Sequence, residues 1–192
     1  MADIERLIPH ILRWECGVLK KEGQTNREYF QIARKKRWSD KKSDRGGKTM
    51  CGVTLKTFTE YRKKKGLPAP TAQELRDIDY DTWLDVLRTL FWNRWKADQI
   101  QNQSIANLVV DWVWGSGEWG IKHPQGVLGV KKDGIVGPKT LAAINGGEPS
   151  TVFKQLWLRR KSHFESVAKG DGQSVNLKGW LNRLNSLKFS SV

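Results

Sequence analysis

Residues 4–15, IERLIPHILRWE, carry the pattern that decides the fold. Ile4, Ile8, Ile11 and Glu15 follow one another at spacings of four, three and four, which predicts an amphipathic helix with a carboxylate on its apolar face. Glutamate normally occupies the solvent face of a helix and is rarely buried, so the position of Glu15 on the apolar face indicates a specific role. Gly17 supplies a stop signal, and Glu15 is therefore expected near the C-terminus of the helix.

The predicted position of Glu15 suits a general acid. The helix dipole and apolar neighbours both disfavour a negative charge at that end of a helix, so a carboxyl there is more easily kept protonated. A general acid near neutral pH needs that protonated form. An ordinary helix-end glutamate paired with Arg13 or a lysine explains the residue equally well at this point.

Helical periods recur through the rest of the chain, and no strong β alternation or internal repeat is found. Cap signals at Thr54, in Thr71–Glu74, at Asp81 and at Ser150 indicate where helices begin. The predicted helices cover residues 55–65, 81–95, 104–114, a short stretch before a turn at Asp133 and Gly134, a short stretch from Pro138, and residues 150–167. Residues 24–48 are predicted to form a polar, basic surface lobe. The fold class is therefore mainly α.

The charge of the chain narrows the class of its partners. Thirty-four Lys and Arg against 20 Asp and Glu give a net charge of +14, which implies a polyanionic partner such as nucleic acid, an anionic membrane or the bacterial cell wall. The sequence contains no run of about 18 apolar residues, so no membrane span is predicted. The N-terminus lacks the pattern of a secretory signal. Two cysteines describe neither a disulfide scaffold nor a zinc site, so no metal or other cofactor is expected.

Three patches together resemble a known family. RWECGV (13–18), DRGGKTMCGVT (44–54) and DWVWGSG (111–117) are similar, in the same order, to motifs of the glycoside hydrolase 108 group of lysozyme-like muramidases, relatives of which are also called secretion activators. Downstream, residues 127–145 and the stretch GWLNRL resemble the small peptidoglycan-binding module that follows in this family. The resemblance covers nearly the whole chain.

The resemblance implies a lysozyme-like helical fold with a small helical peptidoglycan-binding-like subdomain. Residues 1–118 would form the catalytic region and residues 119–192 the binding region, packed as one unit with the first. The implied activity is that of an N-acetylmuramidase, which hydrolyses the β-1,4 bond between N-acetylmuramic acid and N-acetylglucosamine. Glu15 would donate the proton, Asp44 would hold the attacking water or stabilise oxocarbenium charge, and Thr49 would position that water by hydrogen bonding.

Further residues are implied as contacts to the sugar. These candidate substrate-binding residues are Thr54, Asp111, Ser116, Trp114 and Trp119. The chain also departs from the family pattern, because Cys16 replaces a glycine after the proposed acid and the segment before Asp44 is more than a dozen residues longer than usual. This insertion could move Asp44, and its Trp38 could serve as a sugar-stacking platform or as an anchor.

Cys16 and Cys51 flank the proposed acid and the glycine-rich turn. Their positions make it possible that they lie close together in space. They could then form a redox-sensitive pair, or they could be ordinary buried thiols.

Several alternatives stay open at the level of the sequence. A catalytically inactive wall-binding or secretion and assembly protein, a nucleic-acid-binding helical protein and a lytic transglycosylase each remain possible, and inversion cannot be told from retention. We expect peptidoglycan glycan strands as the partner, no nucleic acid, no stable membrane insertion and a monomer. Action on the cell wall, in the periplasm or outside the cell, would follow release through a holin or a dedicated secretion system, and a phage or prophage origin fits.

Overall fold

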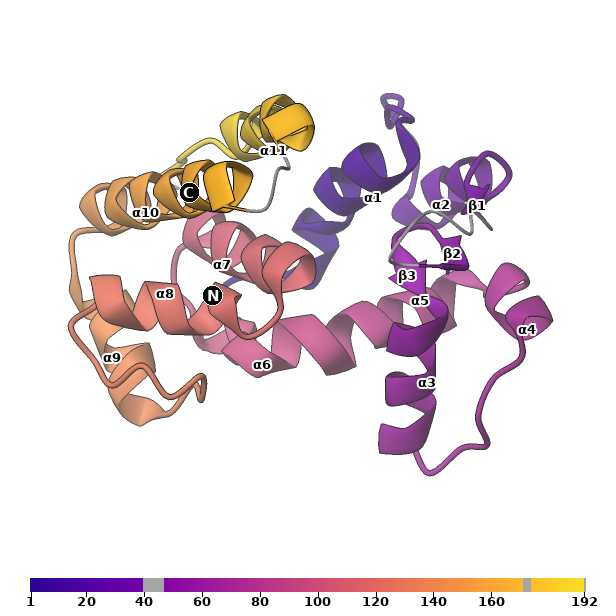
Figure 1. Cartoon of the computed structure of the whole chain (residues 1–192), viewed down its shortest axis with the longest axis horizontal. Helices are drawn as coiled ribbons and strands as arrows, with labels where there is room; N and C mark the ends of the chain where they lie inside the picture. Colours follow the sequence, from indigo (N-terminus) through magenta and orange to yellow (C-terminus); the bar gives the residue numbers. More distant parts are fainter. Residues whose placement is uncertain (40–46, 171–173, 192) are drawn as a thin grey trace. The chain divides into compact units, whose positions relative to one another are not determined.

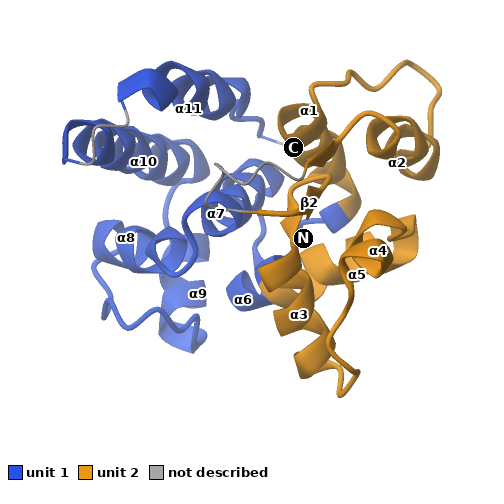
Figure 2. Ribbon diagram, turned by 45° about the vertical axis from the view of Figure 1, so that its right-hand side comes forward, with its two compact units in different colours: residues 1–4, 91–192 blue, residues 5–90 orange. Residues whose placement is uncertain are grey.

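The computed structural model describes residues 1–39, 47–170 and 174–191. The chain divides into two compact units, residues 5–90 and residues 1–4 with 91–192 (Figure 2). Helices dominate both units, and the one sheet in the described residues is small (Figure 1). This confirms the mainly α fold class predicted from the sequence.

Helix α1 (Ile8–Cys16) carries Glu15 in its last turn, as the sequence predicted. The single helix expected over residues 4–15 is divided, because a 3-10 turn (Ile4–Arg6) precedes α1. Pro9 lacks an amide hydrogen and is best tolerated in the first turn of a helix, which is where it lies in α1. Gly17 ends the helix at a left-handed φ of 64°, with its amide donating to the Arg13 carbonyl over 2.9 Å.

Helix α2 (Asn26–Arg34) lies in the stretch that we expected to be an irregular surface lobe. A capping box between Thr25 and Glu28 begins it. Its buried Phe30 ring lies 5.3 Å from the ring of Trp83, so α2 contributes to the core of the unit formed by residues 5–90.

Three two-residue strands form an antiparallel sheet in the order β1 (Trp38–Ser39), β2 (Thr49–Met50) and β3 (Val53–Thr54). Trp38 pairs with Met50 and Thr49 with Thr54. Cys51 and Gly52 connect β2 to β3 with φ angles of 46° and 80°. Positive φ at both positions is typical of a type I′ hairpin turn, which glycine adopts without strain.

Two short helices follow the sheet. Thr54 caps α3 (Leu55–Lys64), as predicted, by accepting a hydrogen bond from the Thr57 amide over 3.0 Å. The predicted capping box begins α4 (Ala72–Arg76).

The long helix predicted over residues 81–95 begins one residue earlier and is interrupted. It consists of α5 (Tyr80–Leu87), a π-helical segment (Arg88–Trp92) and α6 (Asn93–Trp95). Asp79 caps α5, whereas Asp81, the residue expected as the cap, pairs with Arg27 at 2.5 Å.

The unit formed by residues 1–4 and 91–192 is built on α7 (Gln103–Ser116), most of whose side chains are buried, as its apolar composition predicted. Both α8 (Trp119–Val127) and α10 (Pro149–Gly170) pack against α7, and α11 (Ser174–Ser186) packs against α10. The short helix α9 (Pro138–Gly146) begins at its proline as predicted.

A glutamate that the sequence reading overlooked begins α10. Glu148 accepts hydrogen bonds from the amides of Ser150 and Thr151 over 3.0 and 2.7 Å. Ser150, expected as the cap, donates its hydroxyl to the same carboxylate. These bonds favour the charged form and lower the pKa of Glu148 to about 2.

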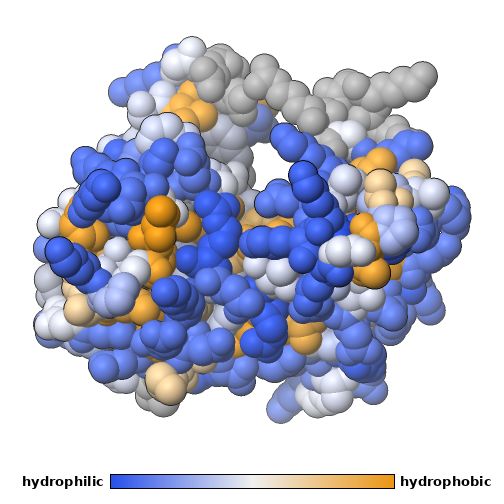
Figure 3. Space-filling view, turned by 90° about the horizontal axis from the view of Figure 1, so that it is seen from below, coloured by the Kyte–Doolittle hydropathy of each residue, from blue (hydrophilic) through white to orange (hydrophobic). Residues whose placement is uncertain are grey.

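Most of the surface shown in Figure 3 is hydrophilic, with apolar patches of limited extent. None of the helices in the described residues has the length and apolar character that crossing a membrane requires.

Candidate active site

The Glu15 side chain packs directly on the turn between β2 and β3. A Cβ atom added to Gly52 would lie 2.5 Å from Glu15 Cγ, 2.7 Å from Cδ and 2.8 Å from Oε2. These distances are shorter than side chains tolerate, so only glycine allows the carboxyl group to lie this close to the turn. Glu15 is half-buried there, which leaves part of the side chain accessible to a substrate.

Side-chain hydrogen bonds to backbone carbonyls fix the turn and the end of α1. The indole Nε1 of Trp83 donates to the Cys51 carbonyl over 3.1 Å. Arg37 Nε donates to the Cys16 carbonyl over 3.1 Å at the end of α1. Both elements that meet at Glu15 are thereby fixed by side chains from elsewhere in the same unit.

The structure brings Cys16 and Cys51 together. Both are buried free thiols. A hydrogen bond between the two thiols and burial raise the pKa of Cys51 far above its usual range. Cys51 therefore remains an uncharged thiol in the turn that contacts Glu15, next to the buried Cys16 at the end of α1.

Thr49 and Thr54 lie opposite each other in β2 and β3, so their side chains share one face of the hairpin. The Thr54 hydroxyl is engaged as the cap of α3 and lies 2.9 Å from the Thr57 hydroxyl. Asp44, the predicted second carboxylate, lies outside the residues that the structure describes.

Asp111 lies where a sugar cannot touch it, which argues against its expected role in substrate binding. Its side chain is fully buried in α7, and its two oxygens pair with Arg160 at 2.8 Å and Arg183 at 2.7 Å. Arg160 is itself 1% exposed. The carboxylate thus joins α7 to α10 and α11, and its negative charge serves to pair with these two buried or partly buried arginines.

Ser116 and Trp114 lie near the end of α7. Ser116 lines a pocket of 240 Å³ together with Arg160, His163 and Trp180. The half-buried Trp114 lies against Phe91, with ring centroids 4.6 Å apart.

Trp119 is the most accessible of the predicted sugar contacts, at 50% exposure. Its ring stacks on His123 at 5.2 Å, and His123 stacks in turn on the buried Trp112 at 5.7 Å. His123 Nδ1 lies 2.7 Å from a nitrogen of Arg159. Burial and the neighbouring positive charge of Arg159 lower the pKa of His123 to about 4.

Gly52 and Trp83 are site residues that the sequence reading missed. A glycine following Cys51 in a two-residue connection is a signal for a hairpin turn, yet the contact with Glu15 joins segments that no local pattern connects. Among the described residues, no group of three His, Cys, Asp or Glu side chains is placed to hold a metal ion.

A mainly α chain in which a helix-end glutamate faces the turn of a small antiparallel sheet has a lysozyme-like fold. The chain belongs to the glycosyl hydrolase 108 family, whose model matches residues 9–117. Residues 119–185 match a second model, described as a predicted peptidoglycan domain.

One solved structure supports the fold independently. The chain is similar to Brucella abortus SagA, with a TM-score of 0.63 and 24% identity over 80% of this chain and 88% of that one. At this identity the likeness shows the fold alone. No curated protein matches the chain.

The two family models together give the chain its general role. It is a glycoside hydrolase with a peptidoglycan-directed region, and peptidoglycan is its partner. Such cell-wall-acting domains imply a site of action outside the cell or in the periplasm.

Proposed function

We propose that the protein is an N-acetylmuramidase that hydrolyses the β-1,4 bond between N-acetylmuramic acid and N-acetylglucosamine, with Glu15 as the general acid. The observation that carries this proposal is the packing of the Glu15 carboxyl group on Gly52. A general acid must be held in one position beside the scissile oxygen, and the turn provides that restraint.

The residues around the scissile bond have different roles in the proposed reaction. Glu15 protonates the departing sugar oxygen as positive charge develops on the ring. Thr49 positions the attacking water through its hydroxyl. Asp44 stabilises that charge or holds the water, a role that rests on the family resemblance alone.

Residues 1–118 form the catalytic region in this proposal, and residues 119–192 bind the wall. The two family models support this division, since one ends at residue 117 and the other begins at residue 119. Trp119 is the best placed of the remaining candidates to bind a sugar, because half of its surface is exposed. Trp114, Ser116 and Thr54 are secondary candidates.

The test measures soluble muropeptides released from purified peptidoglycan. Glu15→Gln keeps the shape of the side chain but removes the acid, and we expect a loss of activity on the order of a hundredfold or more. Glu60→Gln is the matched control, because it makes the same change on the exposed face of α3.

The wild type and Glu60→Gln should be equally active, with circular dichroism showing that all three proteins are folded. Mass spectrometry of the new chain ends separates hydrolysis from formation of anhydro ends. Full activity of Glu15→Gln, or an inactive wild type, would overturn the proposal, and the second result would favour a wall-binding role.

A further inference from the structure

A pocket that no step above uses lies on the unit formed by residues 5–90. It has a volume of 300 Å³ and lies between α2, the sheet and the end of α4. We call it the arginine pocket. Its lining residues are Gln31, Arg34, Lys35, Trp38, Met50, Arg76 and Asp77.

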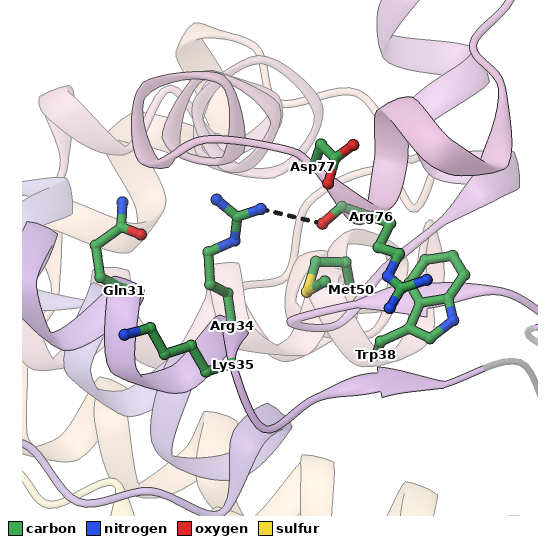
Figure 4. A pocket seen from close by; sticks show the side chains of 7 residues that line it. All are labelled: Gln31, Arg34, Lys35, Trp38, Met50, Arg76 and Asp77. Atoms are coloured by element: carbon green, nitrogen blue, oxygen red, sulfur yellow. Dashed lines mark hydrogen bonds between the residues drawn. The ribbon is translucent and has the colours of Figure 1, made fainter.

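Figure 4 shows how these side chains lie. Arg34 stands on one side of the pocket, Arg76 and Trp38 on the other, and Met50 between them, whereas Lys35 extends away from the Arg34 guanidinium. Trp38 and Met50 are paired in register across β1 and β2, so their side chains share one face of the sheet. The pocket therefore combines two guanidinium groups with an apolar floor and wall.

Among the residues that the structure describes, ion pairs do not neutralise the positive charge of this pocket. Its lining holds three cationic side chains and one carboxylate, Asp77, which accepts a hydrogen bond from Gln73 over 2.6 Å. Within the part of the chain that the structure describes, Arg34, Lys35 and Arg76 form no ion pair.

Other arginines of the same unit do find carboxylates. Arg27 pairs with Asp81 at 2.5 Å and Arg62 with Glu74 at 3.2 Å. Hydrogen bonds from Thr82 are the chief cause that lowers the pKa of Asp79, and the charges of Arg27 and Arg34 contribute to a smaller extent. Arg34 and Arg76 thus keep guanidinium N–H groups available for an anion.

Each guanidinium group has a contact inside the pocket. Arg34 Nη2 donates to the backbone carbonyl of Arg76 over 3.2 Å, which spans from α2 to α4. The Arg76 guanidinium lies 5.9 Å from the centre of the Trp38 ring. Positioned arginines lose less entropy on binding a carboxylate than free ones, and their planar forks match its two oxygens.

The pocket and the proposed catalytic acid contact the same hairpin, formed by β2 and β3. Met50 forms the pocket floor, and the next two residues of the chain are the turn that packs on Glu15. The charge of Arg34 also reaches this turn, because it acts on the Cys51 thiol. A ligand in the pocket would therefore lie on the same structural element that positions the acid.

We propose that the arginine pocket binds a carboxylate of the peptidoglycan stem peptide, with Arg34 and Arg76 on the charge and Trp38 and Met50 against the adjoining aliphatic atoms. The proposal rests on the proposed function, since a muramidase acts beside sugars that carry these peptides. The volume equals about ten waters of liquid and suits one or two amino-acid residues. Phosphate is the less suitable anion because it offers no apolar surface to the indole and thioether.

The experiment compares rates on two substrates, whole peptidoglycan and glycan strands stripped of their peptides by an amidase. In Arg34→Gln/Arg76→Gln we expect the ratio of kcat/KM for whole over stripped substrate to fall on the order of tenfold, as for the loss of charge-assisted hydrogen bonds. Lys63→Gln/Lys64→Gln removes the same charge from the exposed end of α3 and should keep the wild-type ratio. An unchanged ratio in the arginine variant would overturn the proposal, including when both rates fall together.

A binding measurement separates this proposal from the proposed function. Calorimetry with a free acidic stem tetrapeptide should show binding to the wild type that is about tenfold weaker in the arginine variant, even if the wild type releases no glycan at all. Inorganic phosphate is the second probe. Phosphate binding as tight as the tetrapeptide, or tetrapeptide binding that does not depend on the two arginines, contradicts the assignment.

Discussion

Replacing Gly52 by alanine should disable the site through position alone. At a φ of 80°, an L residue is destabilised by about 1–2 kcal/mol. The new methyl group would also lie 2.5 Å from Glu15 Cγ and must be separated from it by about 0.9 Å more to reach an ordinary contact of 3.4 Å. A displacement of about 1 Å at a catalytic group lowers the rate on the order of a hundredfold.

Gly66→Ala is the matched control for this prediction. Its φ is 70°, so the backbone strain is similar, but nothing lies within 4 Å of the added Cβ. Urea unfolding should show comparable destabilisation of the two variants, whereas release of muropeptides should fall only in Gly52→Ala. Activities of the two variants within about twofold of each other would refute the argument that the turn positions the acid.

Three further predictions concern stability and chemistry. Asp111→Ala should lower the free energy of unfolding by about 3–5 kcal/mol, because it leaves the buried charge of Arg160 without its partner. Asp81→Ala removes an exposed ion pair and should cost less than about 1 kcal/mol. Equally small losses for both variants in urea titrations would contradict the importance of the buried ion pairs of Asp111. Cys16 and Cys51 should react slowly with a thiol reagent in the native protein and promptly after unfolding, since both are buried and the pKa of Cys51 is raised; prompt native reaction would contradict this. The pKa of His123 is lowered to about 4, so its ring stays neutral in the folded protein. Its contribution to the free energy of unfolding is therefore complete above pH 6.5 and is lost as the pH falls from 6.5 to 4, by about 1 kcal/mol after solvent screening. His123→Gln should flatten the pH dependence of the free energy of unfolding between pH 6.5 and 4.

The helices were largely predictable because their caps and periods are local. Thr54 and the box at Thr71–Glu74 begin helices where the sequence indicated. α2 was missed although Thr25 and Glu28 form the same kind of box, because the basic charge of the surrounding stretch outweighed the short apolar stripe. The sheet was missed because strands of two residues leave no alternation to detect.

The candidate site could be predicted only where one residue carried the signal. The apolar-face position before Gly17 made Glu15 a candidate, and the motif that resembles the family turned it into the proposed acid. Its neighbour Gly52 requires knowledge of a contact between α1 and a distant turn. Asp111 is conspicuous in its motif, but its carboxylate forms ion pairs with arginines 49 and 72 residues away. Nothing in the local sequence indicates these long-range partners.

The π-helical segment at Arg88–Trp92 allows one helical run to serve two separate cores. Trp83, before the segment, is buried in the unit formed by residues 5–90. Trp92 and Trp95, within and after it, are buried in the other unit, where Trp95 donates to the Gly120 carbonyl over 3.1 Å. A wider turn changes the angular phase of everything that follows it. One continuous stretch of backbone therefore supplies large buried indoles to both units, on either side of the point where its turns widen.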